Sequence, residues 1–170
     1  MMRIGTIGTG FIVDNFIDAV SKTDNAEVVV IYSRSEDTAQ AFAAKHNLKK
    51  WHTDPDAFLN DPGIDVVYVA SPNSLHYQWT LDALKAGKGV ICEKPFVSTH
   101  AECETLCNLA QEKGLFLVEA ITVPHLPNFQ LIRDHLDKIA PVRLVQLNFS
   151  QYSSKHKAFL EGKNPNIFNP

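Results

Sequence analysis

The sequence is poor in cysteine, and none of its three cysteines stands in a CxxC pair. The odd set of Cys92, Cys103 and Cys107 excludes a simple disulfide framework and favours a reducing compartment, so we expect a cytoplasmic protein. Long hydrophobic runs are also missing, because no apolar stretch approaches the ~20 residues that cross a bilayer. Three glycines interrupt the first eleven residues, so we expect no signal peptide there.

A cluster of basic residues is absent as well. Lysine and arginine total 16 against 19 aspartates and glutamates, which gives a formal net charge of −3, and the basic residues are scattered. This balance argues against a nucleic-acid partner bound through phosphate neutralisation. With 45% apolar and 21% charged residues, the chain has the composition of a globular protein with a real core. Its 170 residues suit one domain, or one domain and part of another.

Short runs rich in Val and Ile alternate with stretches of helical periodicity over the first 120 residues. Several of these runs are apolar on both faces, as in parallel strands covered by helices on each side. The pattern predicts an α/β fold with a doubly wound parallel sheet of the Rossmann type. The strands are expected at Arg3–Ile7, Glu27–Tyr32, Asp65–Ala70, Gly89–Cys92 and Leu115–Val118.

Three predicted helices have legible ends. The helix Thr99–Lys113 opens with a capping box of Thr99 and Glu102 and ends before Gly114, a residue suited to a left-handed cap. Its periodicity assigns Cys103 and Cys107 to the core, with Leu106 and Ala110. A helix over 73–86 is expected to be capped by Asn73 or Ser74, and Thr53-Asp54-Pro55 opens a short one.

The pattern changes after Glu119, so we expect domain boundaries of 1–120 and 121–170. Phe129–Ile139 is predicted to be helical. In Val142–Gln151 apolar and polar residues alternate, which predicts a strand of a mainly antiparallel sheet in a second, α+β domain. One strand is not stable alone, and we expect that domain to be incomplete. The strand could instead extend the first sheet at its edge or pair with a second copy of the chain.

The first strand runs into Gly8-Thr9-Gly10-Phe11-Ile12-Val13 and then into an amphipathic helix. This placement matches the first two glycines of the dinucleotide fingerprint, which allow a tight turn and a close approach of the backbone to a pyrophosphate. Val13 occupies the third glycine position, which predicts looser packing between helix and strand. The fingerprint is weak alone, and its position between strand and helix strengthens it.

The second strand ends in Ser33-Arg34-Ser35, and the first carboxylate after it is Glu36. Sites specific for NAD usually carry a carboxylate near this point for the ribose 2′-hydroxyl. A guanidinium between two serines instead suits a 2′-phosphate. We therefore expect NADP(H) as cofactor, with NAD(H) possible. The alternative is that Arg34 is a solvated loop residue.

Two further turns follow strands at the same predicted sheet edge, where ligands of open α/β folds bind. The first turn is Ser71-Pro72-Asn73-Ser74-Leu75-His76, in which Asn73 could simply cap a helix and His76 could be a satisfied buried histidine. The second is Glu93-Lys94-Pro95. A charged pair directly after an apolar strand is a poor choice for a purely structural turn, because both charges lose water there.

The ordered set GTGF, SR, SPNSLH and CEKP resembles the glucose-fructose oxidoreductase and inositol dehydrogenase family (Gfo/Idh/MocA), and within it the dihydrodiol and aldose dehydrogenase branch. The resemblance implies a Rossmann domain followed by a substrate-binding and dimer-forming domain. It implies that Lys94 is the catalytic lysine, that Glu93 contacts the nicotinamide ribose, and that Glu119 and Ala120 lie near the nicotinamide. The expected cofactor-binding residues are Gly8, Thr9, Gly10, Phe11, Ile12, Ser33, Arg34, Ser71, Pro72, Asn73, His76, Glu93, Lys94 and Glu119.

The resemblance implies an NAD(P)-dependent oxidoreductase that acts on a sugar, polyol or related hydroxyl or carbonyl compound. Its partners would be this small-molecule substrate and, in the full-length form, further copies of itself; no metal site and no membrane partner are expected. A second catalytic His or Tyr would lie beyond Pro170, and His125 is a minor substitute. The alternative is a non-catalytic dinucleotide-binding protein, redox-sensing or regulatory, or an inactive cofactor-domain fragment.

Overall fold

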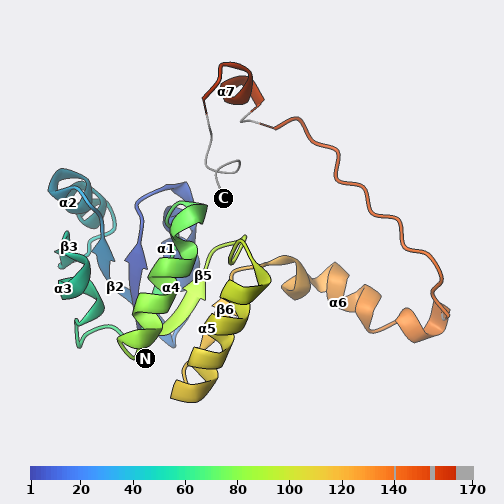
Figure 1. Cartoon of the computed structure of the whole chain (residues 1–170), viewed down its shortest axis with the longest axis horizontal. Helices are drawn as coiled ribbons and strands as arrows, with labels where there is room; N and C mark the ends of the chain where they lie inside the picture. The colour runs from blue at the N-terminus through green and yellow to red at the C-terminus, as the bar shows by residue number, and fades with distance from the viewer. Residues whose placement is uncertain (140, 154–155, 164–170) are drawn as a thin grey trace. The chain divides into compact units, whose positions relative to one another are not determined.

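The computed structural model describes residues 1–139, 141–153 and 156–163, and a six-stranded parallel sheet lies at the centre of its first part (Figure 1). The strands are β1 (Met2–Ile7), β2 (Ala26–Tyr32), β3 (Trp51–His52), β4 (Val66–Val69), β5 (Gly89–Cys92) and β6 (Leu117–Glu119). Their order is β3-β2-β1-β4-β5-β6, which is the Rossmann order. The predicted α/β fold with a doubly wound parallel sheet of the Rossmann type is confirmed.

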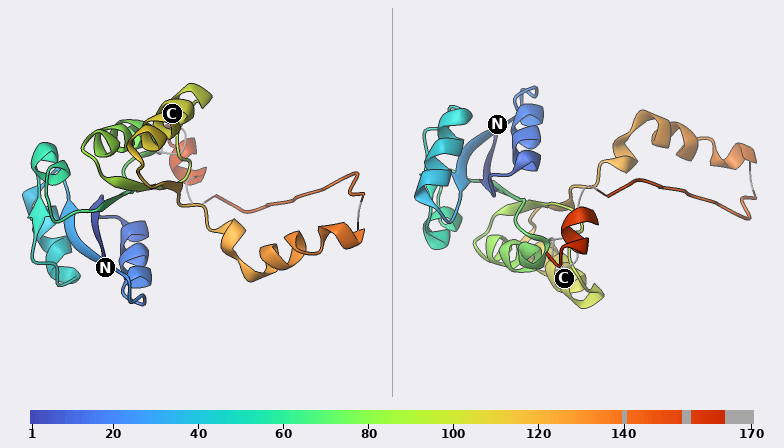
Figure 2. Two further views of the ribbon diagram at one scale, coloured as in Figure 1. Left: turned by 90° about the horizontal axis from the view of Figure 1, so that it is seen from below. Right: turned by 90° about the horizontal axis from the view of Figure 1, so that it is seen from above.

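Five helices cover the two faces of this sheet: α1 (Phe11–Val20), α2 (Glu36–Lys45), α3 (Pro55–Leu59), α4 (His76–Lys85) and α5 (His100–Lys113). Side chains of α1 and α2 share one buried cluster, and those of α3, α4 and α5 share another. Figure 2 shows the blue α1 on one side of the sheet and the green α4 and yellow-green α5 on the other. All four residues of β4 are buried, because both faces of the strand are covered.

The helices α3 and α5 begin or end at the capping residues that the sequence predicts. Both bonds of the Thr99 and Glu102 capping box form, and Gly114 ends α5 in the left-handed conformation. Asp54 caps α3 by accepting a hydrogen bond from Ala57 N–H. The predicted cap of α4 is wrong: residues 73–75 form a 3₁₀ turn, and α4 begins at His76 without a side-chain cap.

The cysteines of α5 are a second correction. Leu106 and Ala110 are the buried residues of this helix, whereas Cys103 is half-buried and Cys107 is exposed. The four positions share the helical spacing that placed them all in the core. The contact with the sheet is centred on Leu106 and Ala110, so the two cysteines lie on its flank.

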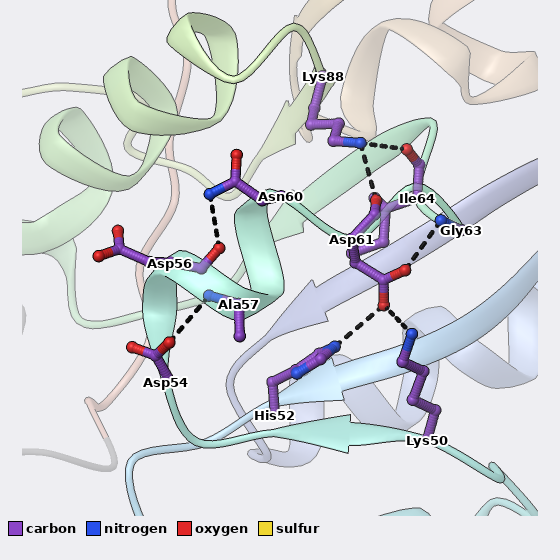
Figure 3. A network of polar contacts seen from close by, with 10 residues as sticks. All are labelled: Lys50, His52, Asp54, Asp56, Ala57, Asn60, Asp61, Gly63, Ile64 and Lys88. Carbon is purple, nitrogen blue, oxygen red and sulfur yellow. Dashed lines mark hydrogen bonds and ion pairs between the residues drawn. The ribbon is translucent and has the colours of Figure 1, made fainter.

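The loop between α3 and β4 is held by a buried carboxylate, drawn in Figure 3. Asp61, 4% exposed, accepts hydrogen bonds from Lys50 Nζ at 2.6 Å, His52 Nε2 at 3.0 Å and Gly63 N–H at 2.9 Å. Lys88 Nζ donates to the carbonyl oxygens of Asp61 and Ile64, both at 2.9 Å. Burial alone raises the pKa of Asp61, but the hydrogen bonds outweigh it and hold that pKa well below its ordinary value.

Internal contacts divide the chain into Met1–Ala120 and a second unit that begins at Ile121. The second unit contains α6 (Pro127–Arg133), a 3₁₀ turn at Leu136–Ile139 and α7 (His156–Leu160), so the stretch 129–139 is helical in two pieces. The predicted strand Val142–Gln151 is wrong, because these residues pair with no described segment and form no strand. The expected start of an antiparallel sheet is likewise absent from the described residues. The tail 164–170 lies outside them.

No described helix combines the length and the apolar character that a membrane span requires.

Candidate functional site

The parallel register brings several of the predicted turns to one edge of the sheet. Ile7, the last residue of β1, lies opposite Tyr32 of β2 and Val69 of β4, and Val69 lies opposite Cys92 of β5. The four strands therefore end at the same level. The turns that follow them begin at Gly8, Ser33, Ala70 and Glu93, so the residues predicted from separate motifs share this edge.

Gly8 makes the first turn possible. Its φ is +111°, and a Cβ at this position would lie 2.6 Å from the carbonyl oxygen of Ala70. The conformation favours glycine and the space excludes any side chain. Gly8 N–H donates to Tyr32 O at 3.3 Å, which joins the turn to the end of β2.

Gly10 stands at the N-terminus of α1 with no side-chain cap, and a Cβ there would meet no atom within 4 Å. The first N–H groups of a helix have no partner inside it and attract anions. The side chain of Phe11 is exposed. Val13, at the third glycine position, is fully buried in the core beside α1. This helix end is open to a phosphate group, as a dinucleotide requires.

A cavity of about 270 Å³ lies against the glycine turn. Six predicted residues line it, together with five that the sequence analysis did not select. Its walls are Ile7, Gly8, Thr9, Tyr32, Ser33, Arg34, Ala70, Ser71, Pro72, Leu75 and Trp79. A larger hollow of about 640 Å³ between α3 and α4 contains none of the predicted site residues.

Trp79 is the most informative residue that sequence reasoning missed. Its ring centroid lies 4.9 Å from that of Tyr32, so two aromatic rings form one wall of the cavity. Leu75, the last residue of the 3₁₀ turn, and Trp79 of α4 lie four residues apart, the spacing of one helical turn. That spacing, directly after the Ser-Pro-Asn turn, is the signal that could have found them.

Arg34 is exposed at the mouth of this cavity. The carboxylate that follows it two residues later, Glu36, already accepts a hydrogen bond within the protein. Glu36 Oε1 accepts a hydrogen bond from the indole Nε1 of Trp51 at 2.7 Å. Ser35 caps α2 by accepting from Thr38 N–H, and its hydroxyl hydrogen remains available as a donor. The cavity mouth therefore presents a guanidinium and hydroxyl groups to a ligand.

The Glu93-Lys94-Pro95 turn is fixed at both ends by carboxylates. Glu93 accepts from Tyr68 Oη at 2.7 Å through Oε1, and from Lys94 N–H at 3.2 Å through Oε2. Glu119 Oε1 accepts from Phe96 N–H at 3.0 Å. Lys94 itself is exposed. These bonds hold the backbone on both sides of Lys94 and leave its side chain at the surface.

His76 connects this turn to the Ser-Pro-Asn turn. The side chain is 1% exposed, and its Nδ1 and Nε2 contact the carbonyl oxygens of Pro95 at 2.8 Å and Ser71 at 3.0 Å. His76 thus lies inside the fold and links two loops of the site.

The remaining predicted residues are placed less closely. Asn73 is half-buried in the 3₁₀ turn, and Ile12 is partly exposed in the first turn of α1. Ala120 N–H donates to Cys92 O at 2.7 Å, which extends the pairing of β6 with β5. His125 belongs to the second unit and is exposed. No three His, Cys, Asp or Glu side chains in the described part of the chain are arranged to hold a metal ion.

Comparison with known proteins gives relatives along the whole chain. It is 40% identical to the uncharacterized oxidoreductase YgjR of Escherichia coli and 38% identical to the scyllo-inositol 2-dehydrogenase (NADP(+)) IolU of Bacillus subtilis. Each match covers 100% of this chain and 52% of the relative. The chain therefore spans about half the length of these relatives.

Solved structures share the fold. KijD10, a 3-ketoreductase from Actinomadura kijaniata in complex with NADP and TDP-benzene, matches with a TM-score of 0.75 and 33% identity over 81% of this chain and 42% of that one. The biliverdin reductase of Synechocystis, in complex with biliverdin and NADP+, has a TM-score of 0.71 and 32% identity over 81% and 43%.

A family model matches residues 2–120, which is the unit that carries the sheet and the site. The chain belongs to the oxidoreductase family with an NAD-binding Rossmann fold, GFO_IDH_MocA.

Proposed function

We propose that this chain provides the NADP(H)-binding half of an oxidoreductase that acts on a sugar, a polyol or a related hydroxyl or carbonyl compound. The observation that carries the proposal is the cavity that joins the glycine turn to Arg34. Relatives named as a scyllo-inositol dehydrogenase and a dihydrodiol dehydrogenase support the substrate class.

Different residues of the site bind different parts of the cofactor. The N-terminus of α1 receives the pyrophosphate at Gly10, and Arg34 with Ser33 binds the 2′-phosphate through charge-assisted hydrogen bonds. Trp79 and Tyr32, whose rings are inclined at 59° to each other, provide an aromatic wall for the adenine. The engaged carboxylate of Glu36 leaves the 2′ position to Arg34. Pro72 and Asn73 border the pyrophosphate, and Glu119 the nicotinamide region.

The chemistry belongs to the cofactor, which supplies or accepts a hydride when bound. Glu93 accepts a hydrogen bond from the nicotinamide ribose. Lys94 is the catalytic lysine: its ammonium donates a hydrogen bond to the substrate oxygen and stabilises the negative charge that develops there. The bonds at Glu93 and Phe96 hold the lysine backbone in position for this role.

The cofactor assignment predicts that NADPH binds more tightly than NADH and that Arg34→Ala removes the preference. Losing charge-assisted hydrogen bonds costs about 1.5–3 kcal/mol, which corresponds to roughly 10- to 100-fold weaker NADPH binding. Calorimetry on the wild type and the variant measures both affinities. NADH affinity is the internal control and stays within about twofold, because NADH lacks the 2′-phosphate. Equal affinities in the wild type would contradict the assignment.

The catalytic assignment predicts that Lys94→Ala lowers the rate of hydride transfer and leaves the affinity for NADPH nearly unchanged. In a preparation that turns over substrate, the variant lowers hydride transfer by about 100-fold or more, the size expected for loss of one donor that stabilises developing charge on the substrate oxygen. NADPH affinity stays within about threefold, since the ammonium acts on substrate. Stopped-flow measurement of NADPH absorbance gives the rate. An unchanged rate would exclude Lys94 as the catalytic group.

A further inference from the structure

Tyr68 lies on β4, one residue before the strand end at which the site is formed, and no step of the proposed function uses it. It is the largest fully buried side chain of the described residues, with 1% of its surface exposed. A buried hydroxyl needs a hydrogen-bond partner. Tyr68 Oη finds it in Glu93 Oε1 at 2.7 Å, 25 residues along the chain. The partner is the residue that precedes Lys94.

The ring of Tyr68 is fixed from the other side by α1. It stacks on Phe16 with a centroid distance of 3.7 Å and an interplanar angle of 8°. Phe16 belongs to the helix whose N-terminus forms the pyrophosphate site. Tyr68 thus connects α1 with the Glu93-Lys94-Pro95 turn, and its hydroxyl has little freedom to move.

The hydroxyl of Tyr68 remains a donor throughout the physiological range. Burial, and then its hydrogen bond to the charged Glu93, raise the pKa of Tyr68 far above its ordinary value. Glu93 therefore receives one hydrogen bond at each oxygen, from Tyr68 and from Lys94 N–H. Each oxygen keeps a second lone pair, and the direction of those lone pairs is set by the two donors.

We propose that Tyr68 is a positioning residue for the nicotinamide half of the cofactor. It orients the Glu93 carboxylate, whose remaining lone pairs then accept the ribose hydroxyl. This assignment rests on the proposed function. It implies that Tyr68 contributes to binding of the nicotinamide half only, because Tyr68 is not among the residues that line the cavity at Arg34.

The test compares NADPH with adenosine 2′,5′-bisphosphate, which keeps the 2′-phosphate and lacks the nicotinamide half. Tyr68→Phe retains the stacked ring and removes only the hydroxyl. We expect NADPH to bind about five- to tenfold more weakly, the size of one lost ordinary hydrogen bond, because the hydroxyl acts on the cofactor through Glu93. The bisphosphate should bind within about twofold of the wild type. Tyr77→Phe, on α4 in the cluster at the other sheet face, is the matched control and changes neither affinity.

A double variant separates positioning from a general structural effect. If Tyr68 acts through Glu93, then Tyr68→Phe combined with Glu93→Gln binds NADPH no more weakly than Glu93→Gln alone. If Tyr68→Phe by itself folds poorly, Glu93→Gln alone still tests the proposal. We expect Glu93→Gln to weaken the binding of NADPH and to leave the binding of the bisphosphate unchanged.

Four results would overturn the proposal. Equal weakening of both ligands by Tyr68→Phe indicates a loosened fold rather than positioning, and so does full additivity with Glu93→Gln. Unchanged NADPH affinity in Tyr68→Phe rejects the role of the hydroxyl while the proposed function stands. A wild-type protein that binds neither ligand rejects the proposed function, and this assignment with it.

Discussion

The three cysteines differ in how far their sulfur atoms are exposed. Cys92, the last residue of β5, is fully buried, and burial raises the pKa of its thiol to about 12. Cys107 is exposed; partial burial, together with a hydrogen bond to Cys103, still raises the pKa of its thiol. Reactivity follows the thiolate fraction and access, so the two positions differ widely.

We predict that iodoacetamide at pH 8 alkylates Cys107 in the folded protein and leaves Cys92 unmodified. Cys107 reacts more slowly than a free thiol, because its raised pKa lowers the thiolate fraction. Peptide mass spectrometry over time measures both sites, and unfolding in urea before labelling is the control that releases Cys92. Modification of Cys92 in the native protein at the rate of Cys107 would contradict its burial.

At the residue scale, the sequence predicted which residues belong to the site better than it predicted which residues hydrogen-bond to one another. The glycine turn and Arg34 were found from their place after a strand, and they line one cavity. The roles of Tyr68 and His76 could not be found in this way, because their partners lie 25 and 19 residues away. A sequence shows which groups can bond, and only the folded register decides which of them meet.

At the element scale, the local signals succeeded where the bonds are local. The capping box of α5 joins residues three apart, and the left-handed Gly114 follows directly. Strand β3 has two residues, too few for a hydrophobic period to appear. Val142–Gln151 has the right period and no partner among the described residues, so alternation alone did not make a strand.

The α3–β4 loop provides a test at the same scale. The folded pKa of Asp61 is depressed, so its charge adds stability above the unfolded value of about 3.9, and this contribution is lost as pH falls toward the folded pKa. We predict that Asp61→Asn lowers the free energy of unfolding by about 1–3 kcal/mol at pH 7 and by less at pH 3. Urea denaturation at both pH values measures the difference.

The control for this loop is Asp56→Asn, because Asp56 is an exposed carboxylate on the neighbouring helix α3. Its effect should remain within about 0.5 kcal/mol. A penalty for Asp61→Asn that is as large at pH 3 as at pH 7 would show that the charge of Asp61 is not what stabilises the loop.

At the scale of the whole molecule, the two units differ in what they bury. Every residue of the two core clusters lies between Ile4 and Ala120. In the second unit, Val145, Leu147 and Phe149 are 66%, 92% and 91% exposed. Exposed apolar runs with free backbone groups favour pairing with another chain, and the chain spans about half the length of its relatives.

We therefore predict that this chain associates with itself as its concentration rises, and that Leu147→Lys shifts it toward the monomer. A charge in an apolar contact is costly to bury. Sedimentation velocity from low to high micromolar concentration measures the change. Gln146→Lys adds the same charge at the neighbouring position, which points to the other side of an extended segment, and should have the smaller effect. A monomer at every concentration would contradict this prediction.

The turn at Gly8 also bears on how this protein varies over generations. Every single-nucleotide missense change of a glycine codon encodes a residue with a Cβ, and no Cβ fits against the Ala70 carbonyl. No milder substitute is therefore within one mutational step. In a saturation library selected for folding, we expect no amino-acid substitution at Gly8 to survive. The nearby exposed position Phe11 should accept many substitutions.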